Sequence, residues 1–227
     1  MFTDRTMASK IKIDLYYDVI SPYSWIAFES LLRYQHVWPI EVNLKPCSLR
    51  GIMMGSGNKP PGVVMNKAIY MMSDLRRNNE FWKMNMSPPK DFMKLIKTET
   101  SDNAMKLLLI IQKERPEKLE IASREFWKRI WSNGEMIFRR PDFEKVLAAS
   151  GITNAPHYID QIDSSLATAL LEQNTKAALD SGAFGAPWIV VHKDGEEHPF
   201  FGSDRLHLIA HLIGQKFTDG LVQYSKL

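Results

Sequence analysis

The chain of 227 residues is 44% hydrophobic and 24% charged, a composition that excludes a wholly disordered protein. Its 29 Lys and Arg residues and 26 Asp and Glu residues give a net charge of +3, and because the two signs alternate along the chain, no nucleic-acid partner is expected. The single cysteine, Cys47, excludes an intrachain disulfide, and no apolar run reaches the roughly 20 residues that span a bilayer, so no membrane partner is expected.

The first predicted elements form a strand–helix–strand unit. Residues 10–18 alternate between apolar and polar, which predicts a strand with one apolar face. Ser21 and Pro22 are typical of the cap and the first position of a helix, which then extends to Tyr34. Residues 41–45 alternate again, so the unit reads β-α-β, a crossover that is almost always right-handed.

A long helical region is predicted next. The Gly- and Pro-rich segment 55–62 is predicted to be a loop, and residues 63–183 show helical periods without a convincing strand. Three helices in this region are expected to begin at Pro116, at Pro141 and at Asp163 or Ser164.

The last predicted elements complete a small sheet. A β-branched strand over 188–192 and a strand over 198–201 flank the turn signal at 193–196. Ser203 is expected to cap a final helix that ends at Gly214. The fold class is therefore α/β: a thioredoxin-like sheet, ordered β-α-β then β-β-α, with a large all-helical insertion.

The same pattern predicts the domain organisation. The two flanks of the chain together form one discontinuous domain, which the helical insertion interrupts. The predicted boundaries are 9–62 and 182–217 for the sheet domain, 63–181 for the insertion and 218–227 for a C-terminal tail.

Two serines lie where the first strand enters the first helix, in the segment Ser21-Pro22-Tyr23-Ser24-Trp25. Thioredoxin-type proteins carry a Cys-x-x-Cys pair at this turn, so disulfide exchange is chemically unavailable here. The free N–H groups and positive end of the helix still favour an anion, and the Ser21 hydroxyl can donate a hydrogen bond to a thiolate that a ligand brings. The alternative is that Ser21 is only a helix cap.

Two further segments suit a peptide-like ligand. Pro187, at the entry to the third strand, is predicted to follow a cis peptide bond, so that the Ala186 main chain can pair with an extended ligand such as glutathione. An ordinary turn proline is the alternative. The segment 201–205 is a second helix start, with Ser and Asp residues suited to the charged end of a small ligand.

Four segments together resemble the kappa class of glutathione transferases, a family that is similar to bacterial 2-hydroxychromene-2-carboxylate isomerases. The resemblance covers about residues 11–216. It rests on YDVISPYSW (17–25), SGNKPPG (56–62), GAFGAP (182–187) and FGSDR (201–205). It implies a thioredoxin-like fold, glutathione as co-substrate and a homodimer.

The resemblance also implies roles for individual residues. Ser21 corresponds to the catalytic serine that stabilises the glutathione thiolate. Ala186 supplies the main-chain pairing, and Asp74 reaches the site of the other subunit. The other implied glutathione-binding positions are Pro22, Tyr23, Asn58, Lys67, Pro187, Ser203, Asp204 and Arg205. In plain sequence terms Asn58 is an ordinary turn residue, so its role depends mainly on the resemblance.

The expected function is conjugation of glutathione to small apolar electrophiles in detoxification, with reduction of lipid hydroperoxides as a further activity. The alternatives are a glutathione-dependent isomerase on the same scaffold and a non-catalytic peptide-binding module. No metal site is expected, because His207 and His211 are only an isolated pair. Eight of the twelve Met residues lie between Met53 and Met93, where they form either an adaptable substrate wall or core and dimer contacts.

The last three residues are Ser225, Lys226 and Leu227, a tripeptide that acts as a peroxisomal address when it ends a chain. The polar, Gly-containing stretch 218–225 favours an exposed end, so the peroxisomal import receptor is an expected partner. Residues 1–10 lack the apolar core of a secretory signal and read as a loose leader. The mitochondrion is the alternative location.

Overall fold

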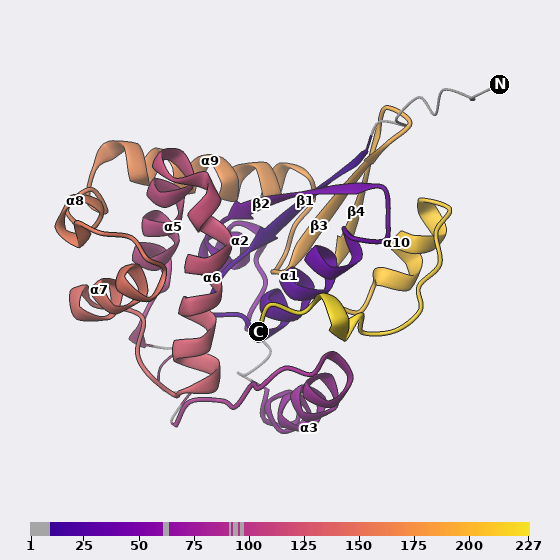
Figure 1. Cartoon of the computed structure of the whole chain (residues 1–227), viewed down its shortest axis with the longest axis horizontal. Helices are drawn as coiled ribbons and strands as arrows, with labels where there is room; N and C mark the ends of the chain where they lie inside the picture. Colours follow the sequence, from indigo (N-terminus) through magenta and orange to yellow (C-terminus); the bar gives the residue numbers. More distant parts are fainter. Residues whose placement is uncertain (1–9, 61–63, 91, 93–94, 96–97) are drawn as a thin grey trace.

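The computed structural model describes residues 10–60, 64–90, 92, 95 and 98–227 of the chain. Its centre is a four-stranded mixed sheet with the order β2-β1-β3-β4 (Figure 1). Strand β1 runs parallel to β2 and antiparallel to β3, and β3 forms a hairpin with β4. The strands are β1 (Ile11–Tyr17), β2 (Ile40–Pro46), β3 (Trp188–Lys193) and β4 (Glu196–Phe201).

The predicted alternation in β1 is confirmed, because the two faces of the sheet bury different helices. Ile13, Leu15 and Tyr17 belong to one buried cluster with residues of α1 (Pro22–Tyr34) and α10 (Leu206–Leu212). Tyr16 points to the other face, into a smaller cluster with residues of α2 (Leu49–Ser56) and α9 (Ser165–Asp180). The sheet is therefore covered by helices on both faces.

The region between β2 and β3 is helical in the part that the structure describes, as predicted. Most of its helices form one group beside the sheet, whereas α3 lies apart from that group, next to α1 (Figure 1). Besides α2 and α9, the elements are α3 (Met65–Trp82), α5 (Asp102–Glu114), a 3₁₀ turn (Pro116–Lys118), α6 (Leu119–Trp127), a π-helical turn (Lys128–Ser132), α7 (Arg140–Ala149) and α8 (Ala155–Ile159). The predicted division of the chain into domains stays a prediction.

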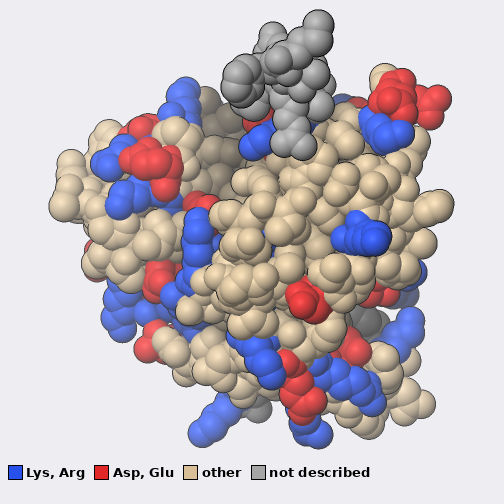
Figure 2. All heavy atoms as spheres, turned by 45° about the vertical axis from the view of Figure 1, so that its right-hand side comes forward, with Lys and Arg blue, Asp and Glu red and all other residues tan. Residues whose placement is uncertain are grey.

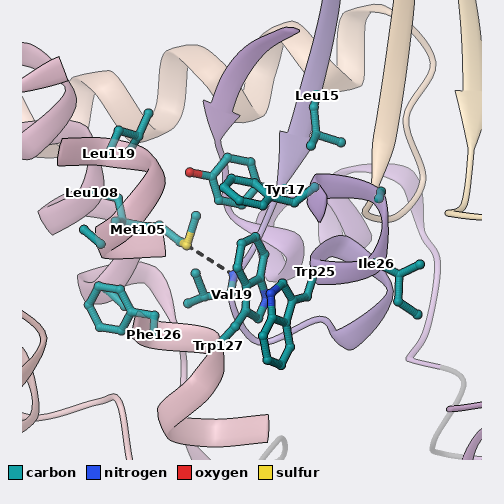
Figure 3. Close-up of a cluster of buried hydrophobic side chains, with 14 of the residues drawn as sticks. Leu15, Tyr17, Val19, Trp25, Ile26, Met105, Leu108, Leu119, Phe126 and Trp127 are labelled. Carbon is teal, nitrogen blue, oxygen red and sulfur yellow. Dashed lines mark hydrogen bonds between the residues drawn. The ribbon is translucent and has the colours of Figure 1, made fainter. Parts of the chain in front are cut away.

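An aromatic core joins the helical region to the sheet (Figure 3). The indole rings of Trp25 in α1 and Trp127 in α6 are parallel within 3°, with centroids 6.2 Å apart. Tyr17 of β1 packs against Trp127, and its hydroxyl hydrogen-bonds the Ser123 hydroxyl of α6 at 2.7 Å. Each of these three aromatic side chains is almost completely buried. The end of β1 and the start of α1 are therefore packed directly against the helical region.

Two predicted boundaries are wrong. The predicted loop 55–62 begins too early, because α2 continues to Ser56 and ends at Gly57, whose φ of 72° suits glycine. Ser48 caps that helix, which was missed. Ser203 does not cap α10, which begins three residues later at Leu206 without a side-chain cap. Pro61 and Gly62 lie outside the described residues.

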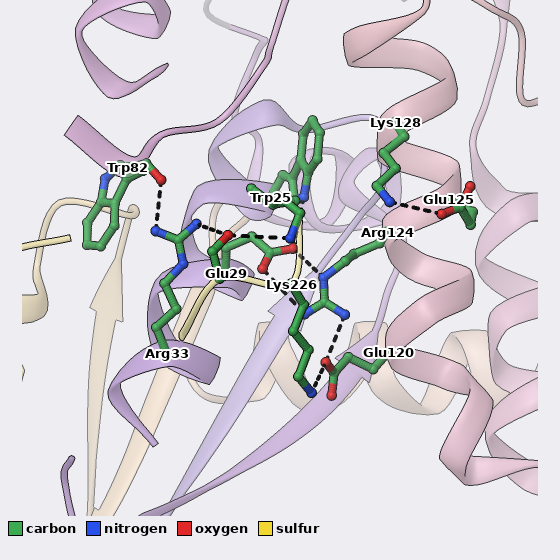
Figure 4. Close-up of polar contacts among 11 residues, drawn as sticks. Trp25, Glu29, Arg33, Trp82, Glu120, Arg124, Glu125, Lys128 and Lys226 are labelled. Atoms are coloured by element: carbon green, nitrogen blue, oxygen red, sulfur yellow. Dashed lines mark hydrogen bonds and ion pairs between the residues drawn. The ribbon is translucent and has the colours of Figure 1, made fainter. Parts of the chain in front are cut away.

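The end of the chain is partly exposed, as its composition favours, and partly packed on the body of the protein. The guanidinium of the buried Arg33 donates to the Gly220 carbonyl oxygen at 2.9 Å and to the Ser225 hydroxyl at 3.0 Å. The Lys226 ammonium lies 2.9 Å from the Glu120 carboxylate of α6 (Figure 4). The exposed residues of this stretch are Thr218, Asp219, Val222, Gln223, Lys226 and Leu227.

The surface has no segregation of charge on the face seen in Figure 2, where basic and acidic side chains are interspersed around a broad uncharged area. A helix long and apolar enough to cross a membrane is absent from the described parts of the chain.

Candidate functional site

Ser21 occupies the N-cap of α1, as predicted. Its backbone is extended, with φ −92° and ψ 118°, and its Oγ accepts a hydrogen bond from the Ser24 amide at 3.1 Å. Pro22 follows at the first helical position, where a missing amide hydrogen has no consequence. The local sequence therefore folds this turn so that one hydroxyl stands at the positive end of a 13-residue helix.

The Ser21 hydroxyl also donates to the carbonyl oxygen of Ala186 at 3.3 Å. The Ala186–Pro187 peptide bond is cis, which confirms the prediction for this proline. When the Ser21 hydroxyl donates a hydrogen bond to an incoming thiolate instead, it loses only this one long hydrogen bond to Ala186. Its Oγ still accepts from the Ser24 amide. The hydroxyl is thus held in place by the helix and remains able to donate to an anion.

Asn58 and the Ser203 turn lie beside the same loop. The Asn58 amide donates to the Phe184 carbonyl oxygen at 2.6 Å, and the Gly202 amide donates to the Pro187 carbonyl oxygen at 3.1 Å. A Cβ atom at Gly185 would lie 2.9 Å from the Phe201 ring, so that ring would have to shift to accept a side chain there. The three separate segments that carry Asn58, Ala186 and Ser203 therefore meet at one place.

The polar residues after β4 form the next part of the site. Ser203 is buried, whereas Asp204 is exposed and lies 3.4 Å from the Arg205 guanidinium, measured from Oδ1 to Nε. Asp204 is also close enough to Tyr23 to raise the pKa of that phenol, although burial and Asp74 act on it more strongly. The turn therefore places one carboxylate near the start of α1, where it can attract a cationic group.

Tyr23 connects this site to α3. Its hydroxyl donates to Asp74 Oδ2 of the same chain at 2.9 Å, and burial raises the pKa of the phenol well above its ordinary value. A cavity of about 340 Å³ opens beside Tyr23 and is lined by Asn66, Lys67, Tyr70 and Met71 as well. Tyr23 thus contacts Asp74 of the same chain, whereas the resemblance implies that Asp74 reaches the site of the other subunit, and that role stays a prediction. The cavity has an aromatic and aliphatic wall.

The Met-rich segment has mixed surroundings. Met71 lines that cavity and is buried, and Met84 and Met86 are buried in the main core, whereas Met54 and Met65 are exposed. Core packing therefore accounts for Met84 and Met86, the role of the segment as a substrate wall stays a prediction, and Met93 lies outside the described residues.

Ser24 of the turn and Cys47, which follows β2, contribute no reactive group. The Ser24 hydroxyl is buried and has no hydrogen-bond partner among the described residues. Cys47 is buried and burial raises the pKa of its thiol, which keeps it in the unreactive protonated form. In the described part of the chain no group of three or more His, Cys, Asp or Glu residues could hold a metal ion.

Sequence reasoning missed two side chains that hold the Ser21 turn. The Trp127 indole donates to the Ser21 carbonyl oxygen at 3.1 Å from more than a hundred residues away. Asp18 is completely buried, and its main-chain oxygen accepts from the Ser21 amide at 3.0 Å. The sequence signal that pointed to Asp18 was an acidic residue at the end of an otherwise apolar strand. The sequence around Trp127 gave no indication that its indole contacts Ser21.

Comparison with known proteins gives consistent results. Residues 12–214 match the family described as DSBA-like thioredoxin domain. The chain is 43% identical over 206 residues to glutathione S-transferase kappa 1 of Caenorhabditis elegans, which covers 90% of this chain and 91% of that one. It is 41% identical over 207 residues to the Homo sapiens protein of the same name, covering 90% and 92%. Among solved structures, a 2-hydroxychromene-2-carboxylate isomerase superposes with a TM-score of 0.71 at 20% identity, covering 89% of this chain and 94% of the other.

Proposed function

Because the chain belongs to the kappa class of glutathione S-transferases, within the DSBA-like thioredoxin-domain family, we propose that it conjugates glutathione to small apolar electrophiles and that Ser21 stabilises the glutathione thiolate. The observation that carries this proposal is the position of the Ser21 hydroxyl. It lies at the N-terminus of α1 and 3.3 Å from the Ala186 carbonyl oxygen, so a ligand sulfur that pairs beside Ala186 would meet both the hydroxyl and the helix end.

The reaction needs only the groups of the site, the two substrates and solvent as the proton acceptor. The glutathione thiol loses its proton to solvent, and the Ser21 hydroxyl donates a hydrogen bond to the thiolate. The sulfur lone pair then attacks the electrophilic carbon, so that a C–S bond forms while a leaving group such as chloride departs with its electron pair. The apolar cavity beside Tyr23 and Met71 offers a place to hold the electrophile next to the sulfur.

A single hydroxyl is sufficient for the required change in pKa. A free thiol with a pKa near 8.5 is only about 3% ionised at pH 7. A downward shift of two units requires about 2.7 kcal/mol. A hydrogen bond to a charged acceptor supplies roughly 1.5–3 kcal/mol, and the helix end adds roughly 0.3–1 kcal/mol.

The remaining polar residues suit the two ends of an extended glutathione. We assign the ammonium of the γ-glutamyl group to Asp204 and its carboxylate to Ser203 and Arg205, because these groups have opposite charge or can donate hydrogen bonds. Asn58, which follows α2, and Lys67 of α3 are assigned to the rest of the tripeptide.

Replacing Asp204 by Asn is expected to raise the KM for glutathione about tenfold. The change removes a charge-assisted hydrogen bond, and because the carboxylate is exposed, we take the lower end of its usual energy, about 1.5 kcal/mol. The kcat is expected to change less than about twofold, because the lost contact is equal in ground state and transition state. Steady-state kinetics with varied glutathione measure both constants. Asp194→Asn, at the exposed tip of the β3–β4 hairpin, is the matched control and should change neither.

Assays of the wild-type chain separate the proposed activity from its alternatives. Conjugation of a chlorinated nitrobenzene tests the transferase activity, and isomerisation of 2-hydroxychromene-2-carboxylate tests the isomerase alternative. Reduction of a lipid hydroperoxide, which would consume two glutathione molecules and yield an alcohol, water and glutathione disulfide, tests the further activity. Activity in none of these assays, together with competition between unfolded polypeptide and glutathione, would favour a peptide-binding module and contradict the proposal.

We propose that the chain forms a homodimer through α3. The exposed apolar residues near this helix form a surface that a second copy can cover, which would bring Asp74 close to the partner's site. They are Val64, Met65, Ile69, Tyr70 and Phe81. Light scattering is expected to give twice the 26.1 kDa mass of one chain, and a mass of one chain would contradict the dimer.

We also propose that the final Ser-Lys-Leu tripeptide directs the chain to the peroxisome, where detoxification of electrophiles and hydroperoxides would take place. The exposure of Lys226 and Leu227 supports recognition by an import receptor, although Ser225 is held by Arg33. A fluorescent protein fused to the N-terminus is expected to enter peroxisomes, and loss of the three residues is expected to leave it outside them. A mitochondrial signal from the intact fusion would favour the alternative.

A further inference from the structure

A buried carboxylate closes the turn that presents Ser21. Asp18 follows β1 and lies three residues before Ser21, and its side chain is completely buried. Its Oδ1 accepts from the Ile20 amide at 3.1 Å, while its main-chain oxygen accepts from the Ser21 amide at 3.0 Å. The side chain and main chain of one residue therefore define the path of the backbone into the catalytic serine.

The same carboxylate is held by the N-termini of two helices far away in sequence. The amide of Leu49, the first residue of α2, donates to Asp18 Oδ2 at 2.9 Å. The hydroxyl of Ser101, the residue that precedes α5, donates to the same oxygen at 2.9 Å. Each of these helix ends favours a negative charge, so Asp18 is positioned from both.

No cation compensates this charge among the groups that face Asp18 in the described structure. The titratable groups around it are Asp102 at the start of α5, Cys47 at the end of β2 and Tyr17 of β1, all acidic or neutral. Burial, with a smaller contribution from Asp102, raises the Asp18 pKa to about 6 despite its three hydrogen bonds. The contribution of Asp18 to the free energy of unfolding therefore decreases as the pH rises from 3.8 to about 6. Stability alone does not explain a carboxylate at this position.

The other contacts of this turn also come from the helical region. The Val19 amide points at the Met105 sulfur of α5 at 3.5 Å (Figure 3), and the Trp127 indole holds the Ser21 carbonyl oxygen. Among the residues that hold this turn, Asp18 accepts three side-chain hydrogen bonds, from Ile20, Leu49 and Ser101. Its loss would release the turn from both helix ends together.

We propose that Asp18 is a positioning residue for Ser21: it ties the turn 18–21 to the N-termini of α2 and α5 and so holds the serine hydroxyl where a thiolate must bind. The proposal rests on the proposed transferase function. Asp18 does not touch the substrate; it acts only through the place and direction of the Ser21 hydroxyl. A hydrogen bond to an anion weakens steeply with misalignment, so a small displacement of the turn is enough to lower the thiolate fraction.

Asp18→Asn tests this with little change in shape. The amide keeps one acceptor for Ile20 but presents an NH₂ group to the Leu49 amide, so at least one contact is lost. The thiol of enzyme-bound glutathione, titrated by its thiolate absorbance, is expected to show a pKa about one unit higher, a tenfold change in its ionisation constant. Near pH 7 the thiolate fraction then falls from about three quarters to about one quarter, so the kcat is expected to fall about threefold, with a smaller change in the KM for glutathione.

The matched control is Asp14→Asn. Asp14 is a half-buried carboxylate in the middle of β1 that accepts a hydrogen bond from Asn43 and is paired with His192, at 3.0 Å each, away from the turn 18–21. This variant is expected to lower the melting temperature without moving the thiol pKa. A shift of the thiol pKa in Asp14→Asn equal to that in Asp18→Asn would overturn the proposal, because it would reflect general loosening of the sheet.

A double-mutant cycle separates a positioning role from a structural one. In the background of Ser21→Ala, adding Asp18→Asn is expected to leave the thiol pKa unchanged, because the hydroxyl that Asp18 positions is gone. Additive shifts would overturn the proposal. If Asp18→Asn does not fold, Ser101→Ala removes one hydrogen bond to the same carboxylate from 83 residues away and is expected to give a smaller shift in the same direction.

The outcomes also distinguish this inference from the proposed function. If Ser21→Ala leaves the pKa of the bound thiol unchanged, the proposed role of Ser21 fails and the inference fails with it. If Ser21→Ala raises that pKa while Asp18→Asn and Ser101→Ala do not, only the positioning role of Asp18 is wrong.

Discussion

Ser21→Ala is expected to lower kcat for conjugation about 10- to 30-fold near pH 7. The lost hydrogen bond to the thiolate corresponds to roughly 1.5–3 kcal/mol, or at least about tenfold in rate. The upper limit follows from the free thiol, which is still about 3% ionised at this pH, so the thiolate fraction cannot fall more than about 30-fold. Ground-state binding of glutathione is expected to weaken less, because most of the tripeptide contacts other residues.

The effect of Ser21→Ala should depend on pH in one direction. The serine lowers the pKa of the bound thiol, so its advantage is greatest below the pKa of free glutathione and declines as the pH rises through about 8.5. Rates of wild type and variant measured from pH 6 to pH 9.5 are thus expected to converge at the alkaline end. A constant ratio across that range would show that Ser21 does not act through thiolate formation.

Ser24→Ala supplies the matched control for this series. It makes the same chemical change three residues later in α1, at a buried hydroxyl without a hydrogen-bond partner among the described residues. The Ser24 amide, which donates to Ser21, is retained. Activity is expected to remain near the wild-type value. The melting temperature should be recorded for both variants, because Ser21→Ala also removes a helix cap with a contribution of about 1 kcal/mol.

Glu29→Gln is expected to lower the free energy of unfolding by about 3 kcal/mol. Glu29 lies in α1 with 1% of its side chain exposed, and it binds Arg124 of α6, 6% exposed, at 2.7 Å (Figure 4). Without the carboxylate a buried guanidinium loses its closest counter-charge. Glu120 remains 2.8 Å from Arg124, which limits the loss to the lower part of the range for broken buried pairs.

Denaturant unfolding measures this loss, and two comparisons make it specific. Glu117→Gln breaks the exposed pair with Arg115 and is expected to leave the free energy of unfolding unchanged within error. Replacing Glu29 and Arg124 together by Met is expected to recover much of the loss, because neither member of the pair is then buried without its partner. Equal effects of Glu29→Gln and Glu117→Gln would show that burial of the Glu29–Arg124 pair does not matter.

Much of the fold could be predicted because its signals are local. The alternation of β1, the cap at Ser164 and the turn at Asp194-Gly195 each depend on neighbouring residues, and each is confirmed. Helix α2 was missed because two glycines and a polar end interrupt its eight residues. Its cap, Ser48, is also hydrogen-bonded to Asp102 of α5, a partner more than fifty residues away.

The candidate site divides in the same way. Ser21 could be identified from one turn of sequence, because capping chemistry and the position before Pro22 are short-range features. The role of Asp18 depends on Leu49 and Ser101, which only the packing of α2 and α5 brings to the end of β1. Ser203 misled for a related reason: Ser and Asp before an apolar run predict a cap, but Gly202 has a φ of 98° and turns the chain before the helix begins.

The lone cysteine and the two serines at the start of α1 bear on the resistance of the enzyme to oxidation. Cys47 is sealed in the interior and kept protonated, and no other thiol exists in the chain. In the proposed reaction every reactive sulfur arrives with a soluble tripeptide and departs with the product. Peroxides that would inactivate a cysteine enzyme therefore react with a replaceable reagent, and the catalyst needs no repair by a reductase between turnovers.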